Sequence, residues 1–203
     1  MTEEQILKIV SDVSENINAN AKWVEKFQET NIEKTYELIM KNINHDHNIF
    51  FKGKGISGGV AKKAAIRLNH IVQAMLKKSG KRAEVRVFFI SESSTPKAHK
   101  DDLVIIVSGS GNKKTLNPLA EKAVENGANL VLFSTYPESV IGKLATHVVE
   151  IPGRVLGKTE SSMPLGTTFE MTTDVVLTAI IALIIKRNGI TDKDLSAVHT
   201  DLE

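Results

Sequence analysis

Two turns rich in serine and glycine are the parts of this chain where backbone and side chains could hold an anion. One follows the apolar run Val104–Val107 and has the sequence Ser-Gly-Ser-Gly at 108–111, with a helix predicted from about Leu116. Hydroxyl groups, accessible backbone N–H groups and the positive N-terminal end of the next helix favour a phosphate group at such a turn. An ordinary strand-to-helix connection has the same composition, so this turn alone leaves both interpretations open.

The second turn lies at Gly53–Gly58, where three glycines follow an apolar strand. Ser57 can cap a helix that is expected to begin near Gly59, or it can donate its hydroxyl to a bound anion. The glycine spacing also fits a dinucleotide-binding loop, but that site needs an acidic residue about 20 positions further on. The basic segment Lys77–Arg82 lies there instead, so dinucleotide binding is the weaker alternative.

Two residues could move protons at a site built from these turns. Glu170 lies near the start of a strongly apolar helix expected over 165–186. A carboxylate there either matches the helix dipole or acts as a general base in a cleft that excludes water. His70 lies in the middle of a helix expected over 60–78, where a lone histidine is commonly a structural or exposed polar residue.

The remaining pattern predicts the elements that must position these residues. Strands are expected at 48–53, 84–90, 104–107, 129–134 and 147–151, with helices at 60–78, 115–126 and 137–145 between them. This alternation predicts an α/β fold, a three-layer αβα sandwich around a roughly five-stranded parallel sheet. Right-handed crossovers then place both serine turns at the same edge of the sheet, where one small-molecule site would explain them together.

The N-terminal region carries no evident chemistry. Apolar residues at helical spacing predict one helix over 2–28, capped by Thr2, and a second over 32–43, capped by Asn31. These helices would pack on the core or on a partner subunit. The expected division is therefore N-terminal helices at 1–45, an α/β domain at 46–188 and a polar C-terminal tail at 189–203.

Composition excludes several function classes. The net charge of +2 and the 5% aromatic content give no reason to expect nucleic-acid binding. With no cysteine, the chain has no disulfide or thiolate chemistry. His45-Asp46-His47 has no third metal ligand close in the sequence, so a solvated loop is expected there. No signal peptide is evident, and the longest apolar run, Val175–Ile185, is shorter than the ~20 residues of a membrane span. We therefore expect a cytoplasmic protein without membrane or metal partners.

From about Phe50 to Ile185 the chain resembles the sugar isomerase (SIS) domain family, and within it the 6-phospho-3-hexuloisomerases. The residues that carry the resemblance are Gly53–Gly58 with Ser57, Arg67–His70, Thr95-Pro96, Asp102–Ile105, Ser108–Gly111, Lys143–Ala145, Ile151–Arg154 and Ser161–Glu170. The resemblance implies a flavodoxin-like sheet and a homo-oligomer, a dimer or tetramer, with N-terminal helices at its interfaces.

The resemblance also implies an activity and a set of site residues. The family's enzymes work without a cofactor or metal and move a carbonyl along a sugar 6-phosphate through an enediolate. Here that would interconvert 3-hexulose 6-phosphate and fructose 6-phosphate. Glu170 would shuttle the proton. His70 would assist at a substrate oxygen or in ring opening, and it could do so at the site of a neighbouring subunit. The substrate would be bound by Gly55, Ser57, Ser108, Gly109, Ser110, Gly111, Asn112 and Lys113.

The sequence departs from the family pattern at three places. Ile56 stands where the family has arginine, and Asn112-Lys113 stands where it has Glu-Thr. Lys113 can restore a positive charge, although an ammonium does not reproduce the forked donors of a guanidinium. The connection around Lys77–Arg82 is also longer than usual. A non-catalytic sugar-phosphate sensor therefore remains an alternative, although no DNA-binding helix-turn-helix is evident before the domain.

Overall fold

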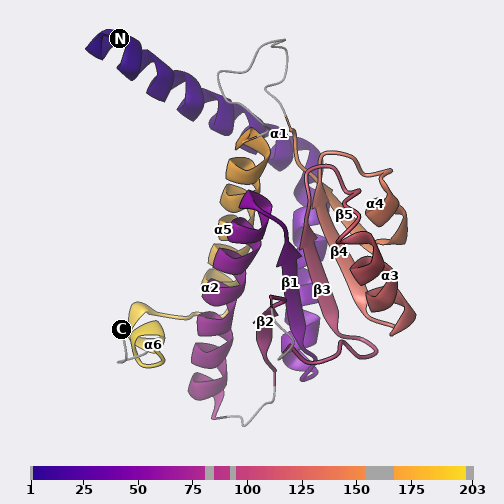
Figure 1. Ribbon diagram of the computed structural model, residues 1–203. Helices are drawn as coiled ribbons and strands as arrows, with labels where there is room; N and C mark the ends of the chain where they lie inside the picture. The colour runs from indigo at the N-terminus through magenta and orange to yellow at the C-terminus, as the bar shows by residue number, and fades with distance from the viewer. Residues whose placement is uncertain (1, 81–84, 92–94, 154–166, 200–203) are drawn as a thin grey trace.

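The computed structural model describes residues 2–80, 85–91, 95–153 and 167–199, and its centre is one parallel sheet (Figure 1). Its strands are β1 (Ile49–Gly53), β2 (Val87–Phe89), β3 (Leu103–Val107), β4 (Asn129–Ser134) and β5 (His147–Glu150). They lie in the order β2-β1-β3-β4-β5, all parallel. The predicted five-stranded parallel sheet is confirmed, with β2 shorter than the expected strand. The strand order is that of flavodoxin-like folds.

Helices cover both faces of this sheet, so the predicted three-layer sandwich is also confirmed. Helices α1 (Glu3–Asn44), α2 (Ile56–Ser79) and α5 (Thr167–Arg187) pack on one face, and α3 (Asn117–Glu125) and α4 (Val140–Leu144) pack on the other (Figure 1). Neighbouring residues of β3 point to opposite layers: Ile105 belongs to the α1/α2/α5 side and Ile106 to the α3/α4 side. A strand buried on both faces must be apolar at successive positions, which explains the continuous run Val104–Val107.

The prediction of two N-terminal helices is wrong, because α1 is a single helix of 42 residues. The sequence around 28–32 contains no glycine or proline to end it, and Gln28 and Asn31 form hydrogen bonds there. Asn31, the expected cap, lies inside the helix, where its Nδ2 donates to Gln28 Oε1 (2.6 Å) and its carbonyl accepts from Thr35 Oγ1 (2.8 Å). The predicted start is confirmed: Thr2 and Gln5 form a capping box.

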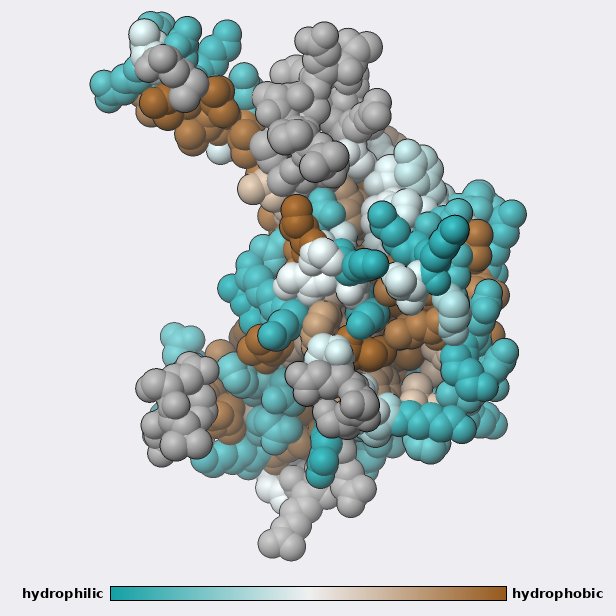
Figure 2. Space-filling view, in the orientation of Figure 1, coloured by the Kyte–Doolittle hydropathy of each residue, from teal (hydrophilic) through white to brown (hydrophobic). Residues whose placement is uncertain are grey.

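The first turns of α1 extend past the sheet and expose apolar side chains. Figure 1 shows this end of the helix projecting from the body, and Figure 2 shows apolar surface along it. The exposed residues are Ile6, Leu7, Ile9 and Val10. The amphipathic stripe read from the sequence is therefore only partly covered within one chain.

Helix α5 is the one described helix that is long and apolar enough to cross a membrane, over Thr168–Arg187. Half of that window is buried inside the protein. Its buried residues, which include Phe169, Val176 and Ile180, belong to the core between the sheet and α1 and α2. Core packing therefore accounts for the apolar composition of α5. The described part of the C-terminal tail contains the short helix α6 (Asp192–Ser196), and the division of the chain into 1–45, 46–188 and 189–203 stays a prediction.

His147 fixes α1 to the edge strand β5 and makes stability depend on pH. Its side chain is 7% exposed, and its Nε2 lies 2.9 Å from the Asn31 carbonyl oxygen. Burial lowers the pKa of His147 below its usual value of 6.5, a hydrogen bond to the Asn31 carbonyl opposes this, and the nearby Lys34 lowers the pKa further. The unfolded chain then binds a proton that the folded chain does not, so the free energy of unfolding decreases as pH falls below about 6.5.

We expect His147→Gln to flatten this dependence, because glutamine keeps a donor for the Asn31 carbonyl but does not titrate. The wild type should lose up to about 1.4 kcal/mol per pH unit from this one group as pH falls between about 6.5 and the folded-state pKa. Urea unfolding at several pH values measures the slope, with the exposed His45→Gln as the control. Equal slopes in the wild type and His147→Gln would contradict the assignment.

Candidate active site

The two serine turns leave the sheet from neighbouring strands. Gly53, the last residue of β1, is paired with Val107, the last residue of β3. The chain then continues into α2 on one side and into the turn Ser108–Gly111 on the other, so the prediction that both turns lie at one edge is confirmed. The order of strands reverses between β1 and β3, and ligands of open α/β sheets bind at such points, beyond the carboxyl ends of the strands.

Ser57 and Glu170 are brought together at this edge. Helix α2 begins at Ile56, with Gly55 as its N-cap at φ 63°, so Ser57 lies in the first turn and is not the cap. The expected start near Gly59 was too late because the left-handed glycine lets the helix begin immediately after β1. The hydroxyl of Ser57 donates to Glu170 Oε1 at 2.8 Å, from the first turn of α2 to the first turn of α5.

The turn at 108–111 is held by its own backbone. The N–H of Gly111 donates to the Ser108 carbonyl (3.0 Å), and the N–H of Ser108 donates to the Phe133 carbonyl (3.0 Å). Gly111 has φ 56°, and a Cβ there would lie 1.9 Å from Ser139 Oγ, so no other residue fits without movement. The Ser108 side chain is 3% exposed, and its hydroxyl has no hydrogen-bond partner among the residues that the structure describes. A buried hydroxyl has a strong requirement for a partner.

Helix α5 places its first turn against this serine turn. The ring of Phe169 packs beside Gly109, so that a Cβ on the glycine would lie 3.3 Å from the ring. Phe169 is buried, and Glu170 follows it directly. Ser57, Ser108–Gly111 and Glu170 therefore lie together at one edge of the sheet, and we call this candidate site the rim site. No sequence pattern predicts the Phe169–Gly109 contact, which depends on how α5 crosses the sheet.

The surroundings of the rim site favour a negatively charged ligand. The first turns of α2 and α3 contain no acidic residue, so their positive ends are not neutralised locally. Lys113 is exposed and forms no ion pair with the described residues. Asn112 is also exposed, and its Oδ1 accepts from Asn117 Nδ2 (3.0 Å). Ile56, at the position for which the family resemblance implies arginine, is 66% exposed in the first turn of α2.

His70 is not brought to the rim site within one chain. It follows Ser57 on α2 by more than three helical turns, about 20 Å along the axis. Between them, Lys63 pairs with Asp174 (2.5 Å), and Arg67 donates to Thr178 Oγ1 (3.2 Å), which holds α2 alongside α5. The ring of His70 lies against that of His199, with 5.6 Å between centroids. Any action of His70 at a rim site therefore requires a second subunit.

Metal ligands are not grouped in the described part of the chain, where no three histidine or acidic residues lie close enough to share an ion. Within the triplet 45–47, His45 directs its Nδ1 at the Lys41 carbonyl (2.8 Å). Of the residues that carry the family resemblance, Arg154 and Ser161–Gly166 lie outside the described residues.

Comparison with known proteins identifies the family. A model of the SIS domain matches residues 42–155, which is more than half of the chain. The chain belongs to the SIS domain family. The 3-hexulose-6-phosphate isomerase of Methylomonas aminofaciens is 35% identical over 170 residues, which cover 82% of this chain and 87% of that enzyme. The 3-hexulose-6-phosphate isomerase of Bacillus subtilis is 32% identical and covers 82% of this chain and 86% of its own.

Solved structures of SIS proteins have the same fold. A hypothetical protein from Methanococcus jannaschii, whose crystal structure infers the molecular function of a 3-hexulose-6-phosphate isomerase, superposes with a TM-score of 0.75 at 27% identity. The match covers 96% of this chain and 98% of that one. The SIS resemblance and the fold that it implied are thus confirmed, whereas the roles of the individual site residues stay predictions.

Proposed function

We propose that this protein is a phosphosugar isomerase that interconverts 3-hexulose 6-phosphate and fructose 6-phosphate. The observation that carries the proposal is the hydrogen bond from Ser57 to Glu170 at the same sheet edge as Ser108, whose buried hydroxyl has no partner among the described residues. This arrangement puts serine hydroxyls that can bind an anion next to a carboxylate that can move a proton. The similarity to named 3-hexulose-6-phosphate isomerases supports the choice of substrate and favours an enzyme over a sugar-phosphate sensor.

The serine turn binds the phosphate group in this proposal. Ser108 and Ser110 donate hydroxyl hydrogen bonds, Gly109 and Ser110 supply backbone N–H groups, Gly111 closes the turn, and Lys113 supplies charge in place of the family's arginine. Asn112 and Gly55 line the same edge. Binding the phosphate at a fixed point holds the reacting carbons next to Glu170, so that binding energy far from the reaction orients the carbons that react.

Glu170 then moves one proton between adjacent carbons. Starting from the 3-hexulose, the carboxylate removes the proton on C2, and the electron pair forms the C2–C3 double bond of an enediolate with the charge on the C3 oxygen. The hydroxyl proton moves from the C2 oxygen to the C3 oxygen, and Glu170 returns its proton to C3. The C2 carbonyl of fructose 6-phosphate results, with no net gain or loss of atoms or electrons.

His70 acts in a homo-oligomer, a dimer or tetramer, where a neighbouring subunit brings it to the rim site and it assists at a substrate oxygen. Two exposed apolar surfaces support such an assembly. One is the N-terminal end of α1 (Figure 2), and the other lies on the packed helices α2 and α5, where Ile56, Ile66, Met171 and Val175 are exposed. The active oligomer is a cytoplasmic enzyme without nucleic-acid or membrane partners in this proposal.

Ser108→Ala tests the phosphate site. Loss of one hydrogen bond to a charged group should weaken binding of fructose 6-phosphate by roughly 10- to 100-fold, because such bonds contribute about 1.5–3 kcal/mol. Binding of unphosphorylated fructose should not change, and the exposed Ser79→Ala is the control. Calorimetry measures both ligands, and NMR follows isomer exchange. Tight binding without exchange in the wild type would favour the sensor, and absence of phosphosugar binding would contradict both functions.

A further inference from the structure

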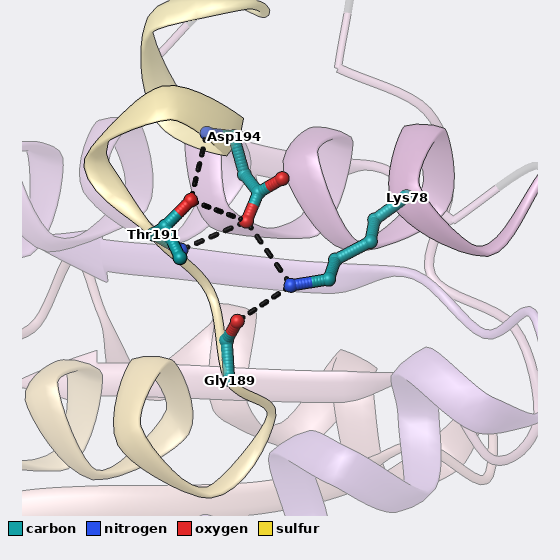
Figure 3. Close-up of polar contacts among 4 residues, drawn as sticks. All are labelled: Lys78, Gly189, Thr191 and Asp194. Atoms are coloured by element: carbon teal, nitrogen blue, oxygen red, sulfur yellow. Dashed lines mark hydrogen bonds and ion pairs between the residues drawn. The ribbon is translucent and has the colours of Figure 1, made fainter.

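The C-terminal segment lies across the second half of α2. We call residues 189–199 the C-terminal clasp; it contains α6 (Figure 1) and contacts α2 through Lys77 and through Lys78, which Figure 3 shows. Lys78 Nζ donates to the Gly189 carbonyl (2.5 Å) and to Asp194 Oδ2 (3.1 Å), and Lys77 Nζ donates to the Ala197 carbonyl (2.8 Å). These bonds fix both ends of α6 on the same helix that carries His70.

The clasp is internally ordered by a capping box. The N–H and hydroxyl of Thr191 donate to Asp194 Oδ2 (2.9 and 2.8 Å), and the N–H of Asp194 donates to Thr191 Oγ1 (3.3 Å) (Figure 3). The backbone and side-chain hydrogen bonds from Thr191, with that from Lys78, lower the pKa of Asp194 from 3.8 to about 2. The carboxylate therefore stays charged and bound to Lys78 at neutral pH.

Apolar burial in the clasp is concentrated at its start, where Ile190 is buried. Helix α6 has no buried residue, although Leu195 touches the main core. Its polar contacts to Lys77 and Lys78 are exposed, and exposed pairs of this kind contribute little to global stability. The clasp can therefore be loosened without unfolding the sheet. The contact made by its last described residue indicates its role.

That residue is His199, whose ring lies 5.6 Å from the ring of His70 at an interplanar angle of 49°. His70 is half-buried on α2, where an isolated long side chain would sample several rotamers. A ring packed against it restricts those rotamers and lowers the entropy lost when the imidazole is placed at a substrate. The contact therefore restricts the orientation of His70, the histidine that assists the reaction in the proposed function.

We propose that the C-terminal clasp is a positioning element for His70 and that His199 is its positioning residue. This inference rests on the proposed function, because it assigns to the clasp the orientation of an imidazole that assists the isomerisation. His199 does not touch the substrate in this scheme. The bonds of Lys78 to Gly189 and Asp194 set the distance between the clasp and α2, and the ring of His199 fixes that of His70.

Lys78→Met and His199→Ala test the clasp in the full-length protein. Both should shift the carbon-bound ring resonances of His70 in a proton–carbon NMR spectrum and lower kcat roughly tenfold, with KM little changed, because small misplacements of a group that assists the reaction reduce its rate. His199→Phe, which keeps a ring against His70, should restore most of kcat. Lys193→Met, a change of the same type on the exposed side of α6, is the control and should leave both readouts as in the wild type.

The outcomes separate the two claims. An active wild type whose kcat is unchanged in Lys78→Met and His199→Ala, although the His70 resonances shift, would overturn the role of the clasp alone. A wild type that binds phosphorylated sugars but interconverts none would overturn the proposed function, and the role of the clasp with it. Loss of kcat in both variants with recovery in His199→Phe is the result that we expect.

Discussion

Glu170→Gln is expected to lower kcat by about 10²- to 10⁴-fold, which is the usual contribution of a general acid–base group. Glutamine has the size of glutamate and can still accept the hydrogen bond from Ser57, so the first turns of α2 and α5 should stay together. It cannot take up a proton from carbon. Affinity for fructose 6-phosphate should therefore change little while turnover is lost, as measured by NMR exchange and calorimetry on the same samples.

Two further samples make this result specific. Glu138→Gln, the same change at an exposed position before α4, should keep the wild-type rate. Mixing Glu170→Gln with His70→Ala should restore part of the activity, because oligomers of the two variants contain sites with an intact carboxylate from one subunit and an intact imidazole from another. A wild-type rate in Glu170→Gln would exclude the carboxylate as the proton carrier.

Gly53→Ala is expected to damage stability and activity together. A Cβ at this position would lie 2.6 Å from the Ser57 carbonyl oxygen and 2.8 Å from the Gly58 nitrogen. Both are backbone atoms of the first turn of α2, so the helix start must move away from β1 and carry Ser57 from Glu170. Overpacking of this kind costs about 1–3 kcal/mol. Urea unfolding measures the loss, and we expect kcat to fall in the fraction that remains folded.

Gly59→Ala, in the first turn of α2 that a Cβ on Gly53 would meet, is the matched control. Among the described residues, nothing outside the adjacent helix backbone lies within 4 Å of a Cβ built on Gly59, and alanine is the better helix former. This variant should gain about 0.5–1 kcal/mol in the free energy of unfolding. Equal free energies of unfolding for Gly53→Ala and Gly59→Ala would show that the space between β1 and α2 can accommodate a methyl group.

The sheet and its edge could be read from the sequence because their signals are local. Runs such as Val104–Val107 are apolar at every position, as strands buried on both faces must be, and glycines mark the turns after them. Handedness of the crossovers then placed the turns of Ser57 and Ser108 together without any coordinates. The composition of the turns therefore predicted the place of the rim site.

The contacts inside the site could not be read in this way. The bond between Ser57 and Glu170 joins residues 113 positions apart, and it depends on the left-handed conformation of Gly55 that starts α2 early. The continuity of α1 also escaped prediction, since Asn31 is a good cap in isolation but is satisfied here by Gln28 and by its place against His147. The distance of His70 from the rim site follows only from the length of α2.

Conversion of fructose 6-phosphate labelled with carbon-13 at C2 tests the central claim most directly. If the rim site binds the phosphate and Glu170 moves a proton between neighbouring carbons, the C2 signal of fructose 6-phosphate (hemiketal in the ring, carbonyl in the open chain) should be joined by the signal of a labelled secondary alcohol carbon as the 3-hexulose forms. The new signal should not appear with Glu170→Gln. A labelled sugar that binds at the rim site and keeps only its original C2 signal, at any enzyme concentration, would contradict the account.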